Sequence, residues 1–329
     1  MKSILYNSYE DLISIDNLLL AWQEFVKGKR SKKDVQLFSF NLMDNIINLH
    51  NDLKNHTYRH DGYQCFKIND PKPRTIHKAL VRDRLLHHAV YRILYPFFDK
   101  TFIPDSFSCR INKGTHKAIN RFREFSYKVS KNNTKTCWIL KCDIKKFFAS
   151  IDQNILINIL QEYIIDKDTV NLLEKVIFSF YPNTPIYAVA EIGVPLGNLT
   201  SQLFSNIYLN KLDQFVKHNL KLKHYIRYAD DFVVLSEDKK YLESTTWLID
   251  SFLQNKLRLI INQNKIFIKT LNSGVDFLGW MNFYDYRVLR TKTKKRMLRK
   301  IKENLTTETL NSYLGLLKHG NTNKIKNEF

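Results

Sequence analysis

The sequence predicts an α+β protein in which helices and strands alternate without a regular rhythm. Segments with apolar residues spaced at three and four alternate with shorter segments rich in β-branched and aromatic residues. A G-x-G-x-x-G motif and a repeating β-α-β pattern are both missing from the sequence, which argues against a doubly wound nucleotide-binding fold. At 329 residues the chain is long enough for two or three lobes, each with its own core.

The first half of the chain is predicted to be mainly helical, with one hairpin and one strand. Residues 8–56 carry two segments with helical spacing. Residues 63–79 alternate around an Asn-Asp-Pro turn and predict a β-hairpin, and residues 80–102 predict a strongly apolar helix. Residues 137–144 predict a strand that delivers Asp143 near its end.

The second half begins with helices that continue to about Phe180 and then places a hairpin between two long helices. The further predicted elements, in chain order, are a helix at 199–219, a hairpin at 224–236, a helix at 238–256, strands at 257–270 and 275–284, and a basic helix after Arg287. From Arg287 to the end, 12 Lys and Arg face 3 Glu, a net charge of +9. Such a run favours phosphate contacts, although a solvated helix face is the alternative.

The overall charge points to a polyanionic partner. The chain has 52 basic and 32 acidic residues, a net charge of +20, which favours nucleic acid over other partners. The four cysteines form no metal-binding spacing and are expected to be reduced thiols. No signal peptide is evident, and no apolar run approaches the roughly 18 residues needed to span a bilayer. We therefore expect a cytoplasmic protein without a membrane partner.

Two adjacent aspartates stand between apolar, strand-like runs in "HYIRYADDFVVLS". Asp230 and Asp231 repel each other and are costly to bury unless a cation compensates them. Together with Asp143 at the end of another strand, they offer the oxygen ligands that Mg²⁺ prefers. Two such ions, roughly 3.5–4 Å apart, activate a hydroxyl and neutralise a leaving pyrophosphate. An ordinary Asp-rich turn is the alternative.

The motifs around these aspartates resemble those of reverse transcriptases. "YADD" and "DIKKFF" are similar to the two metal-binding motifs of the palm, and the other motifs follow in the family's order. They are "PKPRTIHKALVRDRLLHHAV" and "FIPDSFSCRINKGTHKAI" for the fingers, "GVPLGNLTSQLFSNIYLNKLDQFV" after them, "LIINQNKIFI", and "FLGW" for the primer grip.

The resemblance implies a right-hand polymerase fold with fingers, an antiparallel-sheet palm and a short basic helical thumb. The implied segments are N-terminal helices and fingers at 1–95, palm at 96–152, fingers at 153–195, palm at 196–282 and thumb at 283–329. The implied activity is RNA-directed DNA polymerisation with dNTPs on a template RNA and cDNA primer duplex.

One subgroup is closer in motif than the rest. Most reverse transcriptases carry Pro-Gln-Gly where this chain has Pro195-Leu196-Gly197, and "LGNLTSQ" is similar to the enzymes of diversity-generating retroelements. "KGTHKAI" and "NSYLGLLKHGNT" also resemble that group. Those enzymes copy a template-repeat RNA with errors at adenines and work with a small basic accessory protein.

The resemblance assigns the metal-binding and catalytic residues. Asp143, Asp230 and Asp231 would bind two Mg²⁺ ions, with Mn²⁺ as an alternative, and the carbonyl of Ile144 would complete one site. Lys265 would protonate the leaving pyrophosphate, although a surface lysine is an equal alternative.

The same resemblance assigns contacts to the incoming nucleotide. Phe148 would exclude a ribose 2′-hydroxyl, with a core position as the alternative. Leu196 replaces an orienting glutamine, which predicts looser discrimination between base pairs unless it is a neutral variant. Arg74, and less directly Lys72, would contact the triphosphate through its donors. Gly197 would allow close backbone approach.

Two groups of residues would contact the template and primer. The primer grip would comprise Phe277, Leu278, Gly279 and Trp280. The basic helix would contact phosphates without reading sequence, through Lys292, Lys294, Lys295, Arg296 and Arg299.

Two alternatives stay open. One is another bacterial reverse transcriptase, of a retron or an antiphage defence system; "LGNLTSQ" argues against the retron. An intron protein would carry a maturase or endonuclease extension, which we do not expect here. The other is a non-catalytic RNA-binding protein on a polymerase scaffold, against which all three aspartates argue.

Overall fold

The computed structural model describes residues 4–6, 8–70, 72–180, 192–303 and 306–326, and the chain divides into two compact units. The first unit takes the described residues of Met1–Ile103, Lys145–Gln214 and Phe252–Ile260. The second takes those of Pro104–Ile144, Phe215–Ser251 and Ile261–Phe329. The five-segment division predicted above stays a prediction, and part of its 153–195 segment lies outside the described residues.

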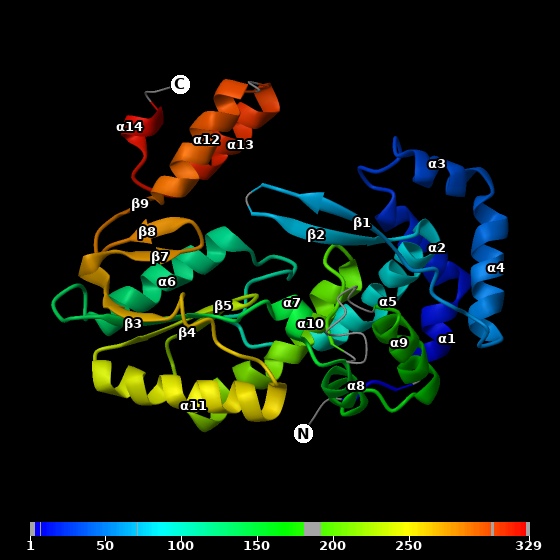
Figure 1. The fold of residues 1–329 in the computed structure, drawn as a ribbon, viewed down its shortest axis with the longest axis horizontal. Coiled ribbons are helices and arrows are strands. Elements are labelled where there is room, and N and C mark those ends of the chain that lie inside the picture. The colour runs from blue at the N-terminus through cyan, green and yellow to red at the C-terminus, as the bar shows by residue number, and fades with distance from the viewer. Residues whose placement is uncertain (1–3, 7, 71, 181–191, 304–305, 327–329) are drawn as a thin grey trace. The chain divides into compact units, whose positions relative to one another are not determined.

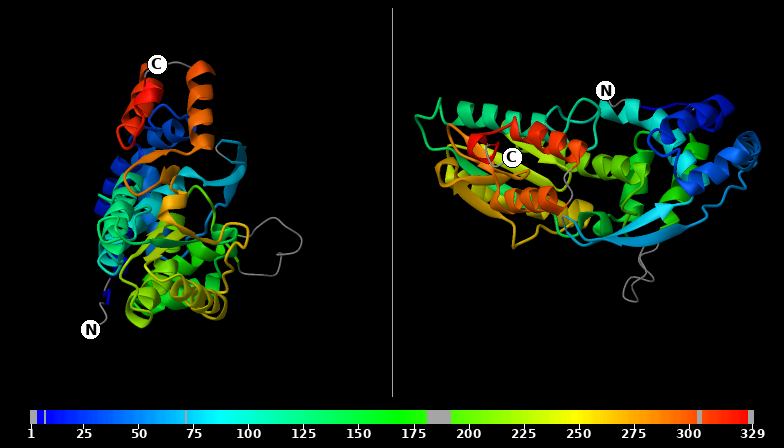
Figure 2. Two further views of the ribbon diagram at one scale, coloured as in Figure 1. Left: turned by 90° about the vertical axis from the view of Figure 1, so that its left-hand side faces the viewer. Right: turned by 90° about the horizontal axis from the view of Figure 1, so that it is seen from above.

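The first unit is a helical assembly with one two-stranded sheet. Its helices are α1 (Ser8–Ile13), α2 (Ile15–Phe25), α3 (Lys33–Phe40), α4 (Leu42–Lys54), α5 (Val81–Asp99), α7 (Phe147–Ser150), α8 (Gln153–Gln161), α9 (Lys167–Phe178) and α10 (Leu199–Gln214). Its strands, β1 (Tyr63–Ile68) and β2 (Arg74–Ala79), pair antiparallel and form one long ribbon (Figures 1 and 2). The predicted N-terminal helices and hairpin are thus confirmed.

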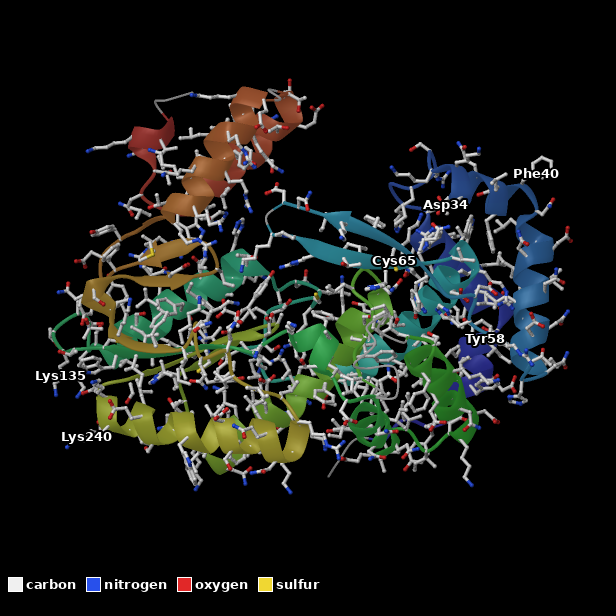
Figure 3. The ribbon with its side chains drawn as sticks, viewed as in Figure 1. Asp34, Phe40, Tyr58, Cys65, Lys135 and Lys240 are labelled. Carbon is white, nitrogen blue, oxygen red and sulfur yellow. The ribbon has the colours of Figure 1, made fainter. Side chains whose placement is uncertain are left out.

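One carboxylate joins the β1–β2 ribbon to two of the helices. Asp34, near the start of α3 (Figure 3), accepts hydrogen bonds from Lys78 Nζ at 2.5 Å and Arg84 Nη2 at 2.7 Å. Lys78 lies on β2 and Arg84 on α5, so this carboxylate joins three elements. A partly buried pair of this kind positions the strand that begins with Arg74.

A buried polar cluster lies under the base of the same ribbon. The hydroxyl of Tyr58 (Figure 3) donates to Asp83 Oδ1 at 2.7 Å, and the ring of His60 stacks on that of His87. Burial raises the pKa of Asp83 to about 6 and lowers the pKa of His87 to about 3. Neither ring nitrogen of His87 has a hydrogen-bond partner among the described residues.

The second unit is built on a four-stranded antiparallel sheet. The strand order is β4 (Tyr225–Tyr228), β5 (Asp231–Ser236), β3 (Trp138–Asp143) and β6 (Phe267–Thr270). Helix α6 (Thr115–Val129) packs on one face, and the first turns of α11 (Lys239–Leu257) lie along the other (Figure 1). The central strands are buried on both faces, which explains their nearly continuous apolar sequence.

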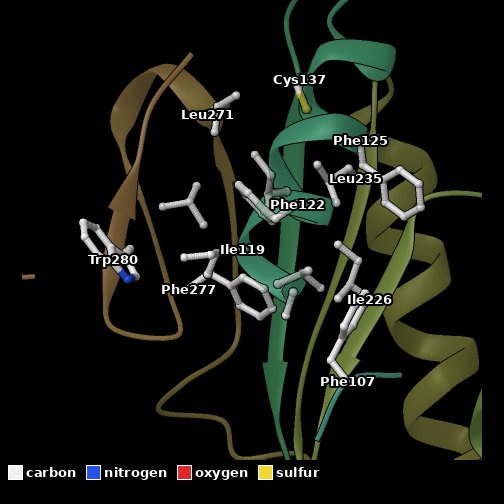
Figure 4. Packing of buried hydrophobic residues seen from close by; sticks show 14 of the residues in the cluster. Phe107, Ile119, Phe122, Phe125, Cys137, Ile226, Leu235, Leu271, Phe277 and Trp280 are labelled. Carbon is white, nitrogen blue, oxygen red and sulfur yellow. The ribbon is translucent and has the colours of Figure 1, made fainter. Parts of the chain in front are cut away.

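A second sheet and three helices complete this unit. Strands β7 (Val275–Phe277), β8 (Trp280–Asn282) and β9 (Arg287–Leu289) form an antiparallel meander, followed by α12 (Thr291–Glu303), α13 (Thr307–Leu317) and α14 (Asn323–Lys326). Figure 4 shows Phe122 and Ile119 of α6 packed between Phe277 of the meander and Ile226 of the main sheet. One apolar core therefore supports both sheets.

Two sequence expectations about strands were wrong, and one strand was not expected. The strand predicted at 257–270 begins only at Phe267, because Leu257 ends α11 and residues 258–266 form a loop. A single bridge pairs Ile261 of this loop with Ile144, the residue after β3. The strand predicted at 275–284 is two strands, because Leu278 and Gly279 have φ of 50° and 87° and form a tight turn. The short β9 was not predicted.

Two further observations concern the chain as a whole. The four cysteines are unpaired, with Cys137 and Cys142 buried and Cys65 and Cys109 exposed. Among the residues that the structure describes, no helix combines the length and apolar character required to cross a lipid bilayer.

The buried histidine predicts a pH-dependent stability. The pKa of His87 is about 3 in the folded chain, below its ordinary value of about 6.5 in the unfolded chain. Its contribution to stability is therefore complete above pH 6.5 and is lost as the pH falls toward 3. We expect His87→Leu to flatten the decrease of the thermal-unfolding midpoint between pH 7 and pH 4, measured by circular dichroism.

The matched control is His218→Leu, a change at an exposed position. It should leave the slope of the wild-type curve unchanged. Equal slopes in wild type and His87→Leu would contradict the assignment.

Candidate active site

The strand register brings two of the three predicted aspartates face to face. Asp143 is the last residue of β3 and pairs directly with Asp231, the first residue of β5. Asp230 lies in the turn between β4 and β5, where Ala229 adopts a left-handed φ of 54°. The carbonyl of Asp230 accepts the N–H of Ile144 at 3.2 Å. Asp143, Ile144, Asp230 and Asp231 are therefore gathered at one end of the sheet.

Lysines compensate two of these carboxylates. Lys265 Nζ donates to Asp143 Oδ1 at 2.6 Å, and Lys141 Nζ lies 3.3 Å from Asp231 Oδ2. Lys141 also donates to the carbonyl of Asp276 on β7 at 2.9 Å. Lys265 is exposed, whereas Lys141 is largely buried, so the two pairs differ in their access to solvent.

The environment of Asp231 favours a cation at its second oxygen. Burial raises the pKa of Asp231 to about 6; Lys141 opposes this rise, and the charges of Asp143 and Asp230 add to it. Asp231 Oδ1 is buried and has no hydrogen-bond partner within the described ranges. An unsatisfied, partly desolvated carboxylate oxygen beside two further carboxylates is a donor set that suits a hard divalent cation.

The side chains of the three carboxylates are not gathered around one point in this structure. Among the described residues, no three His, Cys, Asp or Glu side chains meet closely enough to hold a metal ion. The two lysines supply the positive charge in this arrangement. The residue types therefore suit divalent ions. In this structure, Asp231 and Asp143 contact the ammonium groups of Lys141 and Lys265.

A loop that sequence reasoning took for a strand also supports Asp143. Asn262 donates its N–H to the carbonyl of Asp143 at 2.8 Å and its side-chain amide to Oδ1 at 3.4 Å. The turn that starts at Asn262 is closed by the N–H of Lys265, which bonds the carbonyl of Asn262 at 2.9 Å. The loop therefore delivers Lys265 to Asp143.

The predicted nucleotide contacts all lie in the first unit. Lys72 and Arg74 are exposed on the β1–β2 ribbon. Phe148 is half-buried on α7, while the neighbouring Phe147 is a core residue. The carbonyl of Phe148 accepts the N–H of Val194 at 2.8 Å, which ties α7 to the segment that leads into Leu196.

The turn before α10 is bonded to β2. The N–H of His77 donates to the carbonyl of Leu196 at 2.9 Å, and the amide of Asn198 donates to the carbonyl of His77 at 2.8 Å. Gly197 has a φ of 112°, and a Cβ there would lie 2.7 Å from Ile76 Cγ2. Glycine at 197 is thus required by contact with β2 as well as by its backbone conformation.

The predicted template and primer contacts lie at the end of the second unit. Phe277 and Trp280 are core residues. Of the four predicted primer-grip residues, only Leu278 and Gly279, in the turn between them, are partly exposed. On α12, Met297 faces inward. The five basic residues of α12 predicted to contact phosphates lie on its outer and lateral faces: Lys292, Lys294, Lys295, Arg296 and Arg299.

Sequence reasoning missed Lys141 and Asn198. Lys141 could have been found, because residues two apart on a strand share a face and "KCD" places Lys141 beside Asp143. Its pairing with Asp231 is a diagonal contact across the two strands, within reach of a long side chain once the register is known.

Comparisons with known proteins find one matching family model and several relatives. The family model for reverse transcriptase (RNA-dependent DNA polymerase) matches residues 67–282. The chain is 25% identical over 246 residues to protein YkfC of Escherichia coli, covering 65% of this chain and 62% of that protein. It is 26% identical over 295 residues to the group II intron-encoded protein LtrA of Lactococcus lactis, covering 70% and 47%. The chain thus spans less than two thirds of either relative.

A solved structure shares the fold. Telomerase from Candida albicans, determined in complex with a fragment of telomeric RNA, aligns with a TM-score of 0.51 at 14% identity. The alignment covers 75% of this chain and 51% of that one. The predicted right-hand polymerase fold with antiparallel sheets is thereby confirmed.

The Lys141–Asp231 pair predicts a coupled loss of stability. We expect Lys141→Met to lower the free energy of unfolding by about 1–3 kcal/mol, because it leaves a partly buried carboxylate without its cation. Asp231→Asn should remove most of that loss in the double variant, as measured by urea denaturation in a double-mutant cycle.

Lys269→Met, on the exposed face of the adjacent β6, is the matched control and should change stability by less than about 0.5 kcal/mol. Additive effects of Lys141→Met and Asp231→Asn would refute the pairing.

Proposed function

Because the chain belongs to the reverse transcriptase (RNA-dependent DNA polymerase) family, we propose that it is an RNA-directed DNA polymerase that extends a cDNA primer on a template RNA. The observation that carries this proposal is the register that sets Asp143 opposite Asp231, next to Asp230. The dNTPs are the substrates, and pyrophosphate is the product.

In this proposal the three carboxylates and the carbonyl of Ile144 hold two Mg²⁺ ions, with Mn²⁺ as an alternative. When bound, such ions lower the pKa of the attacking hydroxyl and neutralise the leaving pyrophosphate. Lys141 stays on Asp231 Oδ2 and leaves Oδ1 for the ion. Lys265 gives up its contact with Asp143 and is then available to protonate the leaving pyrophosphate.

The first unit supplies the proposed nucleotide contacts. Arg74 contacts the triphosphate, with Lys72 nearby in sequence, through the donors that suit phosphate oxygens. Phe148 presents a half-buried ring as the steric barrier to a ribose 2′-hydroxyl. The bonds from the 196–198 turn to β2 support this grouping, because they hold Leu196 and Gly197 against the strand that begins with Arg74.

Template and primer contacts are proposed for the second unit. The turn at Leu278–Gly279 would support the primer end, and the basic residues of α12 would contact duplex phosphates. Such contacts are independent of sequence and weaken with added salt.

We further propose that the enzyme is of the diversity-generating kind, with errors at template adenines and a small basic accessory protein as partner. Support comes from "LGNLTSQ" and from the aliphatic Leu196 at the position of an orienting amide. A hydrogen-bonding side chain discriminates geometry more sharply than an aliphatic one. The similarity to LtrA favours a second candidate, a more accurate enzyme of the intron-encoded kind.

Primer extension tests the polymerase proposal. We expect the wild type, given an RNA template, a DNA primer, Mg²⁺ and four dNTPs, to extend the primer. Asp230→Asn should reduce the rate at least about 10²-fold, because it removes a charged metal ligand. Asp16→Asn, at an exposed position on α2, should keep the wild-type rate. Extension that survives in Asp230→Asn would contradict the assignment.

Sequencing of the cDNA tests the subgroup. We expect errors concentrated opposite template adenines in the wild type and roughly tenfold fewer in Leu196→Gln, which restores an orienting amide. Leu37→Gln, an identical change at an exposed residue of α3, should leave the error rate unchanged. Accurate wild-type copies would reject the mutagenic subgroup in favour of the intron-encoded, retron or defence kinds.

A further inference from the structure

A cavity of about 400 Å³ lies in the second unit, lined by none of the catalytic carboxylates. Its walls come from α6, from the turn between β8 and β9, and from the loop at 318–321 that follows α13. A cavity of this size is sufficient for a nucleotide-sized ligand.

An arginine in this cavity lacks a complete set of partners. Arg287 Nε donates to the carbonyl of His319, and Nη2 donates to Asn120 Oδ1 at 2.7 Å. Arg287 Nη1 is buried and has no hydrogen-bond partner among the described residues. Two of its nitrogens therefore fix the guanidinium, and with it a positive charge, in the wall of the cavity.

The surroundings of Arg287 are positive. Arg123 and Lys318 also line the cavity, and the pKa of Arg287 is lowered by burial and by the charge of Arg123. Asp285 is the one acidic residue among the lining residues, and it accepts a hydrogen bond from Asn133 Nδ2 at 2.9 Å. Like charges that line one cavity are stabilised by an anion that lies between them.

Aromatic rings border the same cavity. The rings of Phe283 and Tyr286 stack with centroids 4.7 Å apart, and Tyr286 is 47% exposed. Exposed rings beside guanidinium groups are the surface on which single-stranded nucleic acids stack their bases. An acidic peptide would use the positive charges but would have no need of the rings.

Gly320 allows the cavity wall to form. A Cβ at this position would lie 2.1 Å from the Trp280 ring, so only glycine permits the chain to cross over the tryptophan. That crossing places the carbonyl of His319 on Arg287 Nε and the N–H of Asn321 on the carbonyl of Arg287 at 2.8 Å. The "KHGN" segment of the sequence thus builds the arginine into the wall.

We propose that this cavity binds a nucleoside phosphate unit, with the phosphate between Arg287 and Arg123 and the base on the Phe283–Tyr286 rings. The inference rests on the proposed function for its source of ligand, namely single-stranded RNA that extends from the copied region. The cavity would then hold the RNA outside the catalytic site and keep it on the enzyme.

The test uses the full chain and a fluorescently labelled ten-nucleotide oligouridine, with binding measured by anisotropy over a range of salt concentrations. We expect Arg123→Gln to weaken binding at least about threefold and to reduce the salt slope by about 0.7, the value for one lost phosphate contact. Tyr286→Ala should weaken binding by about fivefold or more through lost stacking. The control is Lys128→Gln, an exposed charge on the same helix that does not line the cavity.

Wild-type affinity in both cavity variants, or equal weakening in the Lys128→Gln control, would overturn the proposal. Competition by 5′-UMP would support a free nucleotide as the ligand, whereas binding of the oligonucleotide alone would support a unit within a strand. Displacement of the RNA by an oligoglutamate peptide at similar concentration would overturn it in favour of an acidic partner.

Primer extension by the wild type, assayed in parallel on a short template, separates the two proposals. Extension with unchanged binding in Arg123→Gln and Tyr286→Ala would reject the cavity and keep the polymerase. Weakened binding in these variants without wild-type extension would support the cavity and reject the polymerase.

Discussion

The second unit has to accommodate the repulsion between two carboxylates that the antiparallel register places opposite each other. Direct pairing of β3 with β5 places Asp143 and Asp231 on opposite strands at the same level, where like charges destabilise a sheet. The fold accommodates this with Lys141 from within the sheet and Lys265 from a loop. Buried strands, covered by α6 on one face, keep the register from slipping and so keep the carboxylates together.

The sequence was sufficient for most of the fold and for the acidic end of the sheet. Apolar runs located the β4–β5 hairpin, period-two alternation the β1–β2 ribbon, and helical spacing the basic helix, because these are local patterns. The sequence was insufficient for the loop at 258–266. Its apolar residues are typical of a strand, but the loop contacts Asp143 and Ile144 without forming a strand. The partners of Lys141 and Asn198 could not be predicted, because they lie on elements distant in sequence.

The turn at 196–198 shows how one motif serves two purposes. Asn198 and the backbone of Leu196 form hydrogen bonds to β2, and Gly197 leaves space for Ile76. The side chain of Leu196 is therefore carried on a backbone that these hydrogen bonds hold firmly in place. Packing and hydrogen bonds to β2 therefore explain part of the "LGN" motif. A comparison of motifs alone would attribute these residues wholly to contact with the substrate.

Lys141 touches both Asp231 and the carbonyl of Asp276, and the side chain of Asp276 accepts a hydrogen bond from Arg290, the residue before α12. These contacts connect β3 to the residue before the basic helix through one residue of β7. The position of the ammonium group that balances Asp231 therefore depends on a strand that carries none of the three carboxylates.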